Sequence, residues 1–169
     1  LRPRVTMGPL HQEKGMIRGR GLVDDAVKRG ANVLNLGKID DMETFNGGWF
    51  MQPSLVTDVP DDAPLMREEQ FCPALPIATY DDVDDAVARA NDTIFGLGGS
   101  VWGKDVDRAL GIARRVQSGT VWVNTHGTQA VNRRAPYGGI KQSGIGRRAG
   151  IEGMYEYLQI QTITSFEAG

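Results

Sequence analysis

The chain has 169 residues, of which 40% are hydrophobic and 24% are charged, which is typical of a globular protein of about one domain. Its 19 basic and 21 acidic residues give a net charge of -2, and this balance argues against a nucleic-acid partner or an anionic membrane surface. A single cysteine and two histidines exclude an internal disulfide and the usual zinc sites, and no apolar run has the length of a membrane span. With no secretory segment at the start, the sequence predicts a cytoplasmic protein that binds no metal, although it opens at Leu1, as a processed protein or a piece of a longer one would.

The first half of the chain is expected to alternate helices with short strands. The helix is predicted by apolar residues at helical spacing and by Gly30 at its end. Pro53 interrupts an extended segment, which predicts an edge or irregular strand there. The predicted elements are a helix at 15–30, a strand at 31–37, a surface loop at 40–48, the irregular strand at 49–59 and a buried strand at 74–80.

The second half continues the alternation. Asp81 or Asp82 is the candidate N-cap of one helix, and Gly119 is the candidate C′ residue of the next. The predicted elements are a helix at 81–93, a strand at 95–103, a helix at 105–119, a strand at 120–124, a glycine-rich loop at 125–150, a helix at 151–159 and a strand at 160–166. This order predicts an α/β fold, a mostly parallel sheet flanked by helices, with no linker that divides the chain.

Cys72 is a candidate nucleophile because it is a lone cysteine in a chain that we expect to be intracellular. Activation of a thiol requires a positively charged environment, whereas Glu68 and Glu69 lie just upstream and disfavour the thiolate. Phe71 and Pro73 flank it closely. The sequence therefore favours a small buried structural thiol at a tight turn.

Glu69 and Phe71 lie two residues apart, so in an extended segment their side chains point to the same side. We expect that side to line a crevice at the carboxyl edge of the sheet. A carboxylate beside a flat ring suits the ribose and the base of a nucleotide. From the residues alone, a surface carboxylate and a core phenylalanine remain the simpler interpretation.

Two further motifs are ambiguous. The segment 144–149, "GIGRRA", fits a loose dinucleotide-binding pattern, but it follows a loop instead of a strand. Phosphate binding by Lys141, Arg147 and Arg148 is therefore the minor alternative. The main expectation is that these side chains pair with acidic neighbours or face solvent. His126 follows the strand 120–124, where α/β sheets bind ligands, although a lone histidine is more often a hydrogen-bonded loop residue.

Four segments, taken in order, carry one resemblance. "PLMREEQFCPALPI" is similar to E-E-x-F-G-P, "ARANDTIFGLGGSVW" to A-N-x-T-x-Y-G-L-A-A, "GTVWVN" to G-x-V-x-[VI]-N, and "APYGGIKQSGIGR" to P-F-G-G-x-K-x-S-G-x-G-R. With matches from about Val23 to Phe166, the chain resembles the NAD(P)-dependent aldehyde dehydrogenases. The resemblance implies that 1–158 is the C-terminal part of an incomplete catalytic domain and that 159–169 holds a strand that joins a neighbouring subunit in a homo-oligomer.

The resemblance also implies roles for single residues. Glu69 would accept hydrogen bonds from the nicotinamide ribose of NAD or NADP, and Phe71 would pack near the nicotinamide ring. Cys72 stands where the family usually has glycine, so it would be a motif residue and not the nucleophile. The aldehyde pocket would be lined by His126, Gly127, Gln129 and Tyr137.

The family's activity is the oxidation of an aldehyde to a carboxylic acid through a cysteine thiohemiacetal and a thioester. Its nucleophilic cysteine, its general-base glutamate and its Rossmann half would all lie upstream of this sequence, so the 169-residue chain alone is predicted to be inactive and to hold no catalytic residue. One alternative is a stand-alone, non-catalytic assembly module that recruits partners through unpaired strand edges. Another is a self-contained thiol enzyme that uses Cys72 and His126.

Overall fold

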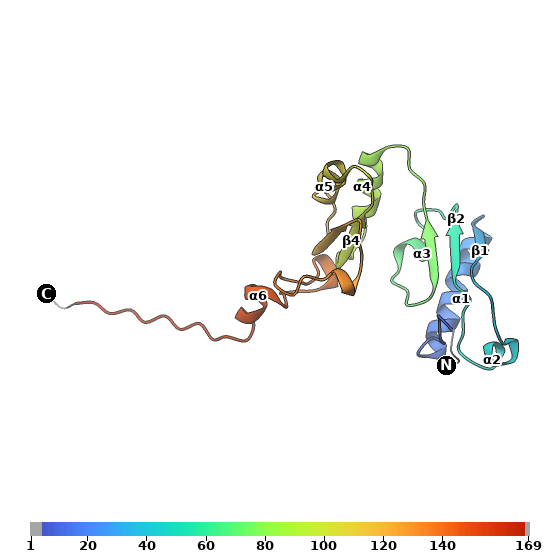
Figure 1. Cartoon of the computed structure of the whole chain (residues 1–169), viewed down its shortest axis with the longest axis horizontal. Coiled ribbons are helices and arrows are strands. Elements are labelled where there is room, and N and C mark those ends of the chain that lie inside the picture. Colours follow the sequence, from blue (N-terminus) through green and yellow to red (C-terminus); the bar gives the residue numbers. More distant parts are fainter. Residues whose placement is uncertain (1–4, 168–169) are drawn as a thin grey trace. The chain divides into compact units, whose positions relative to one another are not determined.

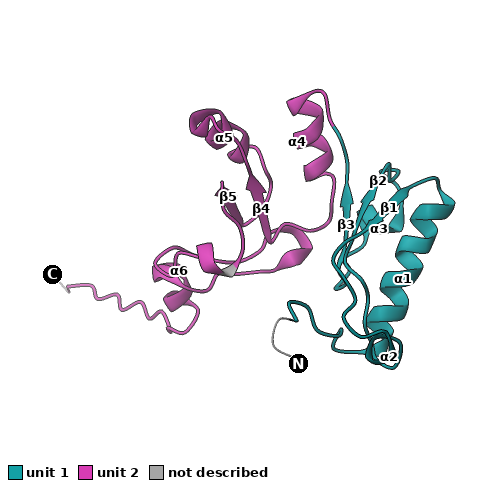
Figure 2. Ribbon diagram, turned by 45° about the vertical axis from the view of Figure 1, so that its right-hand side comes forward, with its two compact units in different colours: residues 1–79 teal, residues 80–169 magenta. Residues whose placement is uncertain are grey.

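The computed structural model describes residues 5–167, apart from the side chain of Thr128. These residues form two compact units, and the chain passes from the first to the second between Thr79 and Tyr80 (Figure 2). No run of glycine, serine or proline marks this junction, which explains why the sequence predicted no dividing linker.

The first unit is a three-stranded sheet with one long helix and two short ones (Figure 1). Strand β2 lies in the centre, antiparallel to β1 and parallel to β3. The elements are α1 (Glu13–Lys28), β1 (Asn32–Asn35), α2 (Met42–Asn46), β2 (Ser54–Thr57), α3 (Pro64–Arg67) and β3 (Ala74–Ile77).

The core of the first unit lies on one face of this sheet. Helix α1 contributes Leu22 and Ala26, which are one turn apart, and α3 contributes Leu65. They pack against Val56 of β2 and Ala74 of β3, and Val56 is completely buried. Burial of a side chain of this size stabilises the fold by about 1.5–3 kcal/mol.

The opposite face of the same sheet carries a row of leucines and is largely open within the described residues. The register aligns Leu34, Leu55 and Leu75 across the three strands, so their side chains form one row. Leu34 is 59% exposed and Leu75 is 60% exposed. We call these three residues the leucine row.

Three predictions for the first unit are corrected. The segment with Pro53 is the central strand and not an edge, because the proline stands just before β2 and its carbonyl oxygen accepts from the Leu36 backbone nitrogen at 2.7 Å. The strand β3 is an exposed edge in the described residues, not a buried strand. The predicted loop 40–48 contains α2, because the Asp41 carboxylate caps the backbone nitrogen of Thr44 at 3.0 Å.

The second unit holds a two-stranded parallel sheet with helices (Figure 1). Asp82 caps α4, as one of the two predicted candidates, and Asp105 caps α5. Helix α5 ends at Ala113, so Gly119 is not its C′ residue. The elements are α4 (Val83–Asn91), β4 (Gly98–Val101), α5 (Val106–Ala113), β5 (Thr120–Val123), the 3-10 helices η1 (Thr128–Ala130) and η2 (Lys141–Ser143), and α6 (Gly150–Tyr155).

The predicted strand at 160–166 is absent: residues 158–167 form no helix or strand and run as an extended segment (Figure 1). Its apolar side chains are among the most exposed, with Ile160 at 89% and Phe166 at 91%. The pattern is that of a strand, but a strand exists only when neighbouring backbone groups accept its hydrogen bonds. Among the described residues, none of the helices combines the length and the apolarity required to cross a membrane.

Candidate functional site

The segment from Glu68 to Pro73 connects α3 with β3 and carries the predicted cofactor-facing residues. Arg18 of α1 holds this connection, since its guanidinium donates to the backbone oxygen of Glu69 and, at 2.9 Å, to the carboxylate of Glu68. The side chains of Glu69 and Phe71 are both exposed, and Phe71 is 81% exposed. The simpler interpretation of Phe71 as a core residue is therefore wrong.

This connection lies at the opposite end of the sheet from the one expected. Phe71 precedes β3, and Met51 precedes the parallel strand β2, so both belong to the amino ends of these strands. The expectation of a crevice at the carboxyl edge is wrong for this residue. Because Phe71 stands before β3 in the chain, and because parallel strands begin at the same edge of a sheet, Phe71 lies at the edge where β2 and β3 begin.

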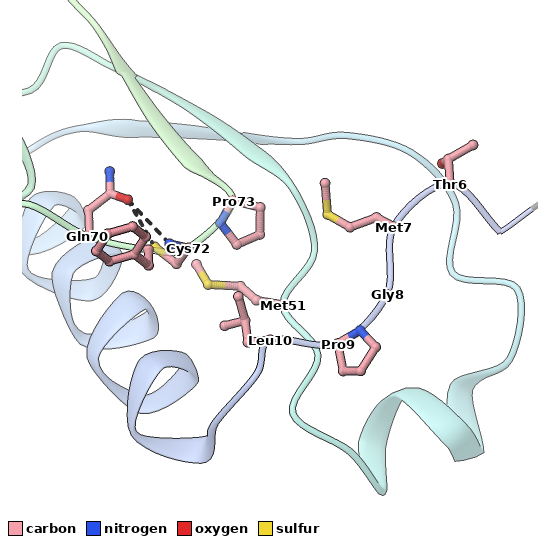
Figure 3. Close-up of a pocket in the computed structure, with 10 residues that line it drawn as sticks. Thr6, Met7, Gly8, Pro9, Leu10, Met51, Gln70, Cys72 and Pro73 are labelled. Carbon is pink, nitrogen blue, oxygen red and sulfur yellow. Dashed lines mark hydrogen bonds between the residues drawn. The ribbon is translucent and has the colours of Figure 1, made fainter. Parts of the chain in front are cut away.

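A pocket of about 590 Å³ opens beside the same connection (Figure 3). Its walls are the segment 6–10, Met51 and the segment 70–73, which includes Phe71. Glu69 is not part of its lining. The structure thus places Phe71 at a pocket, while a face shared with Glu69 stays a prediction.

Cys72 lines this pocket but is packed as a structural residue. A Cβ atom built on Gly19 of α1 would lie 2.8 Å from its sulfur, so the thiol fits against the bare helix backbone at that point. Burial raises the pKa of the Cys72 thiol above its usual value, and a hydrogen bond with the Ala74 backbone and the charge of Arg18 lower it by less. The predicted direction is confirmed, but its cause is desolvation and not the neighbouring carboxylates.

The segment 124–130 follows β5 in the second unit and carries three of the four predicted pocket residues. Its first residue, Asn124, adopts a positive φ of 53° and exchanges two hydrogen bonds of 2.8 Å with the backbone of Gly103. His126 and Gln129 are exposed, and Gly127 has a φ of 86°, which glycine adopts without strain. His126 thus follows the carboxyl end of β5, as the order of elements predicted, while its place in a pocket wall stays a prediction.

The side chain that holds this segment was missed from the sequence. Trp122 of β5 donates its indole N–H to the carbonyl oxygen of Ala130 at 3.1 Å. The rings of Trp122 and His126 meet edge to face, with their centroids 5.0 Å apart and their planes at 64°. A tryptophan within a strand next to the glycine-rich strand β4 was the available signal, because glycine leaves room for a large ring.

Tyr137, the fourth predicted pocket residue, is fixed by its own partner on the glycine-rich loop. Its backbone pairs with Arg148 through two hydrogen bonds of 2.7 and 2.8 Å, and the Arg148 guanidinium lies 4.9 Å from the centre of the Tyr137 ring. Arg147 donates to the carbonyl oxygens of Gly139 and Gly146 at 2.9 and 2.7 Å. The side chain of Tyr137 is therefore held at a defined place in this loop.

The basic residues of this loop contact other parts of the second unit. Lys141 donates to the backbone oxygens of Asn91 and Thr93 at 2.7 and 3.0 Å, and the arginines contact carbonyl oxygens and the Tyr137 ring. The predicted pairing with acidic neighbours is replaced by contacts with backbone carbonyls, whereas the predicted exposure to solvent is confirmed for Lys141 and Arg148. Within the part of the chain that the structure describes, no cluster of three or more His, Cys, Asp or Glu could hold a metal.

The predicted residues thus lie in two places, with Glu69 and Phe71 in the first unit and the four pocket residues in the second. Against this geometry, the family model described as "Aldehyde dehydrogenase family" matches residues 1–163. The chain belongs to the aldehyde dehydrogenase family. The resemblance drawn from the four sequence segments is confirmed.

Individual aldehyde dehydrogenases support the same conclusion. The chain is 37% identical over 164 residues to "Aldehyde dehydrogenase 1A1" of Homo sapiens, and this match covers 97% of the chain and 32% of that protein. The crystal structure of a Mycobacterium tuberculosis aldehyde dehydrogenase complexed with NAD+ is 36% identical, with a TM-score of 0.83 over 93% of the chain and 32% of that structure. Betaine aldehyde dehydrogenase from Staphylococcus aureus in complex with NAD+ gives a TM-score of 0.84 at 31% identity, covering 99% of the chain and 35% of that structure.

The chain spans about a third of the length of these relatives. The predicted α/β fold, as part of an aldehyde dehydrogenase catalytic domain, is confirmed by the structural matches. The same matches describe a partial domain, in agreement with the small sheets of the two units.

Proposed function

We propose that this chain forms part of an NAD(P)-dependent aldehyde dehydrogenase that oxidises an aldehyde to a carboxylic acid. The observation that carries the proposal is the family match over residues 1–163, in which the four family-like segments occur in order. Two structural relatives were solved with NAD+, and another is described as complexed with NAD+ and octanal. The chemistry that the cofactor supplies when bound is acceptance of a hydride from the substrate.

Within this function, Glu69 and Phe71 would form part of the wall that holds the nicotinamide end of the cofactor. Their surroundings fit that role, since both side chains are exposed and Arg18 anchors the backbone oxygen of Glu69. The carboxylate would accept hydrogen bonds from ribose hydroxyls, and the ring would cover an apolar face of the nicotinamide. The two side chains thus have suitable chemistry for the cofactor and are accessible to it.

The residues His126, Gly127, Gln129 and Tyr137 would line the aldehyde side. We infer that the covalent step, attack of a thiolate on the aldehyde carbon, uses a cysteine outside these 169 residues. Cys72 is unsuited to it, because its raised pKa keeps it protonated near neutral pH and because it stands at the family's usual glycine. The raised pKa also argues against the alternative thiol enzyme. The 169-residue chain alone is therefore expected to form no carboxylic acid.

The test compares two neighbouring carboxylates in a complete subunit that carries these 169 residues. Glu69→Gln is expected to raise the KM for the cofactor on the order of tenfold, as loss of a charge-assisted hydrogen bond would. Glu68→Gln is the matched control, because this carboxylate pairs with Arg18 and is expected to leave that KM unchanged. The assay is the formation of NADH or NADPH with a set of aldehydes.

Equal effects of the two substitutions would contradict the assignment of Glu69. Absence of aldehyde-dependent cofactor reduction by the complete subunit would refute the proposed function as a whole. Reduction by the isolated 169-residue chain, in turn, would show that a nucleophile lies within it.

A second candidate is a non-catalytic assembly module, and the exposed C-terminal segment favours it. Ile160, Ile163 and Phe166 are separated from one another by pairs of polar residues and are each more than four-fifths exposed, so they present apolar surface that has no partner within the described residues. In either role we propose that residues 159–169 pair with another subunit of a cytoplasmic homo-oligomer. Light scattering distinguishes the two candidates: the isolated chain as a discrete oligomer indicates a module, whereas open-ended aggregation contradicts it.

A further inference from the structure

Trp122 occupies a position in the fold that none of the roles above explains. Residue 122 is paired in register with Ser100 of the neighbouring strand β4, so its indole lies on the same sheet face as Gly98 and Ser100. A Cβ atom on Gly98 would come within 2.8 Å of the indole carbon Cζ3. The glycine therefore leaves the space in which the indole ring lies.

From this place the ring contacts the following loop at two points. The indole N–H donates to the Ala130 carbonyl oxygen at 3.1 Å, and the indole and the His126 imidazole meet edge to face with their centroids 5.0 Å apart. The other end of the loop is fixed independently, because Asn124 is bonded twice to the backbone of Gly103. The residues between these anchors are 125–129.

We propose that Trp122 is a positioning residue that sets the shape of the aldehyde pocket by fixing the loop 125–129. This inference rests on the proposed function, in which His126, Gly127 and Gln129 line that pocket. A loop held only at Asn124 would sample many conformations, since Gly127 adds backbone freedom. The contact with Trp122 at the far end limits this freedom and orients the imidazole. Its chemical consequence is selectivity among aldehydes, because the loop presents one fixed surface to the substrate.

The loop contact is tested directly in the 169-residue chain by NMR. The chain has two histidines, so His11 provides an internal control for the imidazole protons of His126. The Trp122 ring should displace the His126 resonances, and the indole N–H of Trp122 should exchange with solvent more slowly than that of Trp49. Trp122→Leu should remove the displacement, whereas Trp122→Phe should keep most of it because an aromatic ring remains. His126 resonances that do not respond to Trp122→Leu would overturn the inference.

The consequence for the pocket is tested in a complete subunit that carries these residues. Trp122→Phe removes the indole N–H that donates to Ala130, together with part of the ring, and it should raise the KM for aldehydes about fivefold while the KM for the cofactor stays the same. Trp102→Phe is the matched control, because it removes an indole hydrogen bond to the Ser100 side chain and leaves the Gly103 backbone that holds Asn124, so it should leave both constants unchanged.

The outcomes separate the inference from the proposed function. An unchanged aldehyde KM in the Trp122→Phe subunit would overturn the positioning role while the dehydrogenase stands. A fall in kcat together with increases in both KM values would also overturn it, since that pattern indicates a general structural defect. An unsubstituted subunit that oxidises no aldehyde would refute the proposed function and with it the pocket role, whereas the NMR response would still decide whether Trp122 holds the loop.

Discussion

Because Cys72 packs against Gly19, replacing Gly19 or Gly21 of helix α1 by alanine should have different effects on the free energy of unfolding. Glycine to alanine within a helix ordinarily stabilises a protein by about 1 kcal/mol. Gly21 of α1 is exposed, and a Cβ atom there would have no neighbour within 4 Å, so Gly21→Ala should show this full gain. Gly19 is buried, and its Cβ would lie 2.7 Å from the Cβ of Cys72 and 3.1 Å from the sulfur of Met51.

Overlap of this kind typically costs about 1–3 kcal/mol. The cost exceeds or cancels the helix gain, so Gly19→Ala should change the free energy of unfolding by about 1–3 kcal/mol less favourably than Gly21→Ala. The assay is urea unfolding of the 169-residue chain followed by far-UV circular dichroism, with the slope m compared between variants. A similar m in all variants assigns the difference to the folded state.

A double-mutant cycle identifies the neighbour responsible. In a Cys72→Gly background the two closest atoms are gone and only the flexible side chain of Met51 stays near, so Gly19→Ala should then stabilise nearly as much as Gly21→Ala does in the original chain. Two results would refute the reasoning. One is an equal gain at both glycines in the original chain, and the other is the same effect of Gly19→Ala in both backgrounds.

Three further predictions concern other close contacts. Gly119→Ala should destabilise the chain by about 3 kcal/mol in urea unfolding, because its Cβ would overlap the backbone oxygen of Gly138, whereas Gly111→Ala, with no neighbour within 4 Å, should stabilise it; equal effects would contradict this packing. Asp105→Ala should cost about 1 kcal/mol in the same assay, because α5 loses its N-cap, and Asp105→Asn should cost much less. Cys72 should be alkylated by iodoacetamide more slowly than a free cysteine at neutral pH, because burial raises its pKa, and the rate should rise only at higher pH; a rate equal to that of a free cysteine would contradict this packing. For the same reason, the folded chain should lose stability as the pH rises above the usual thiol pKa, because the unfolded chain then loses the thiol proton more readily than the folded chain.

The elements that the sequence predicts well are those whose signals are local. Helix α4 was predicted from an aspartate at its N-cap and an apolar stripe, and α5 from its apolar stripe, and these signals lie within the helix or next to its start. Helix α2 was missed because it has only five residues, too few for a periodic pattern, and its Asp41 cap stands in a segment of polar residues and glycines typical of a loop.

What a strand pairs with is a property of distant residues, and here the sequence was less informative. Pro53 indicates an edge only if it stands inside the strand, and it stands one residue before β2. The β-branched residues at 160–166 favour a strand, but the hydrogen-bond partner that a strand requires is not supplied by the described residues.

The candidate site shows the same difference between features with local signals and features that depend on distant residues. The four family-like segments were sufficient to identify the family, and the placement of His126 after β5 was predicted from the order of elements. The role of Trp122 depends on Gly98 in another strand and on Ala130 eight residues later, and neither contact leaves a pattern within a short window. Likewise, the end of the sheet at which Phe71 lies required the parallel pairing of β2 with β3.

The leucine row has a practical consequence for work with the purified chain. Fluorescent dyes such as ANS bind exposed apolar surface, and their emission is widely taken as a sign of a molten globule. Leu34, Leu55 and Leu75 offer such a surface on a sheet whose other face is well packed. Bright dye emission from this chain is therefore compatible with intact tertiary structure, and near-UV circular dichroism is the appropriate criterion for its folded state.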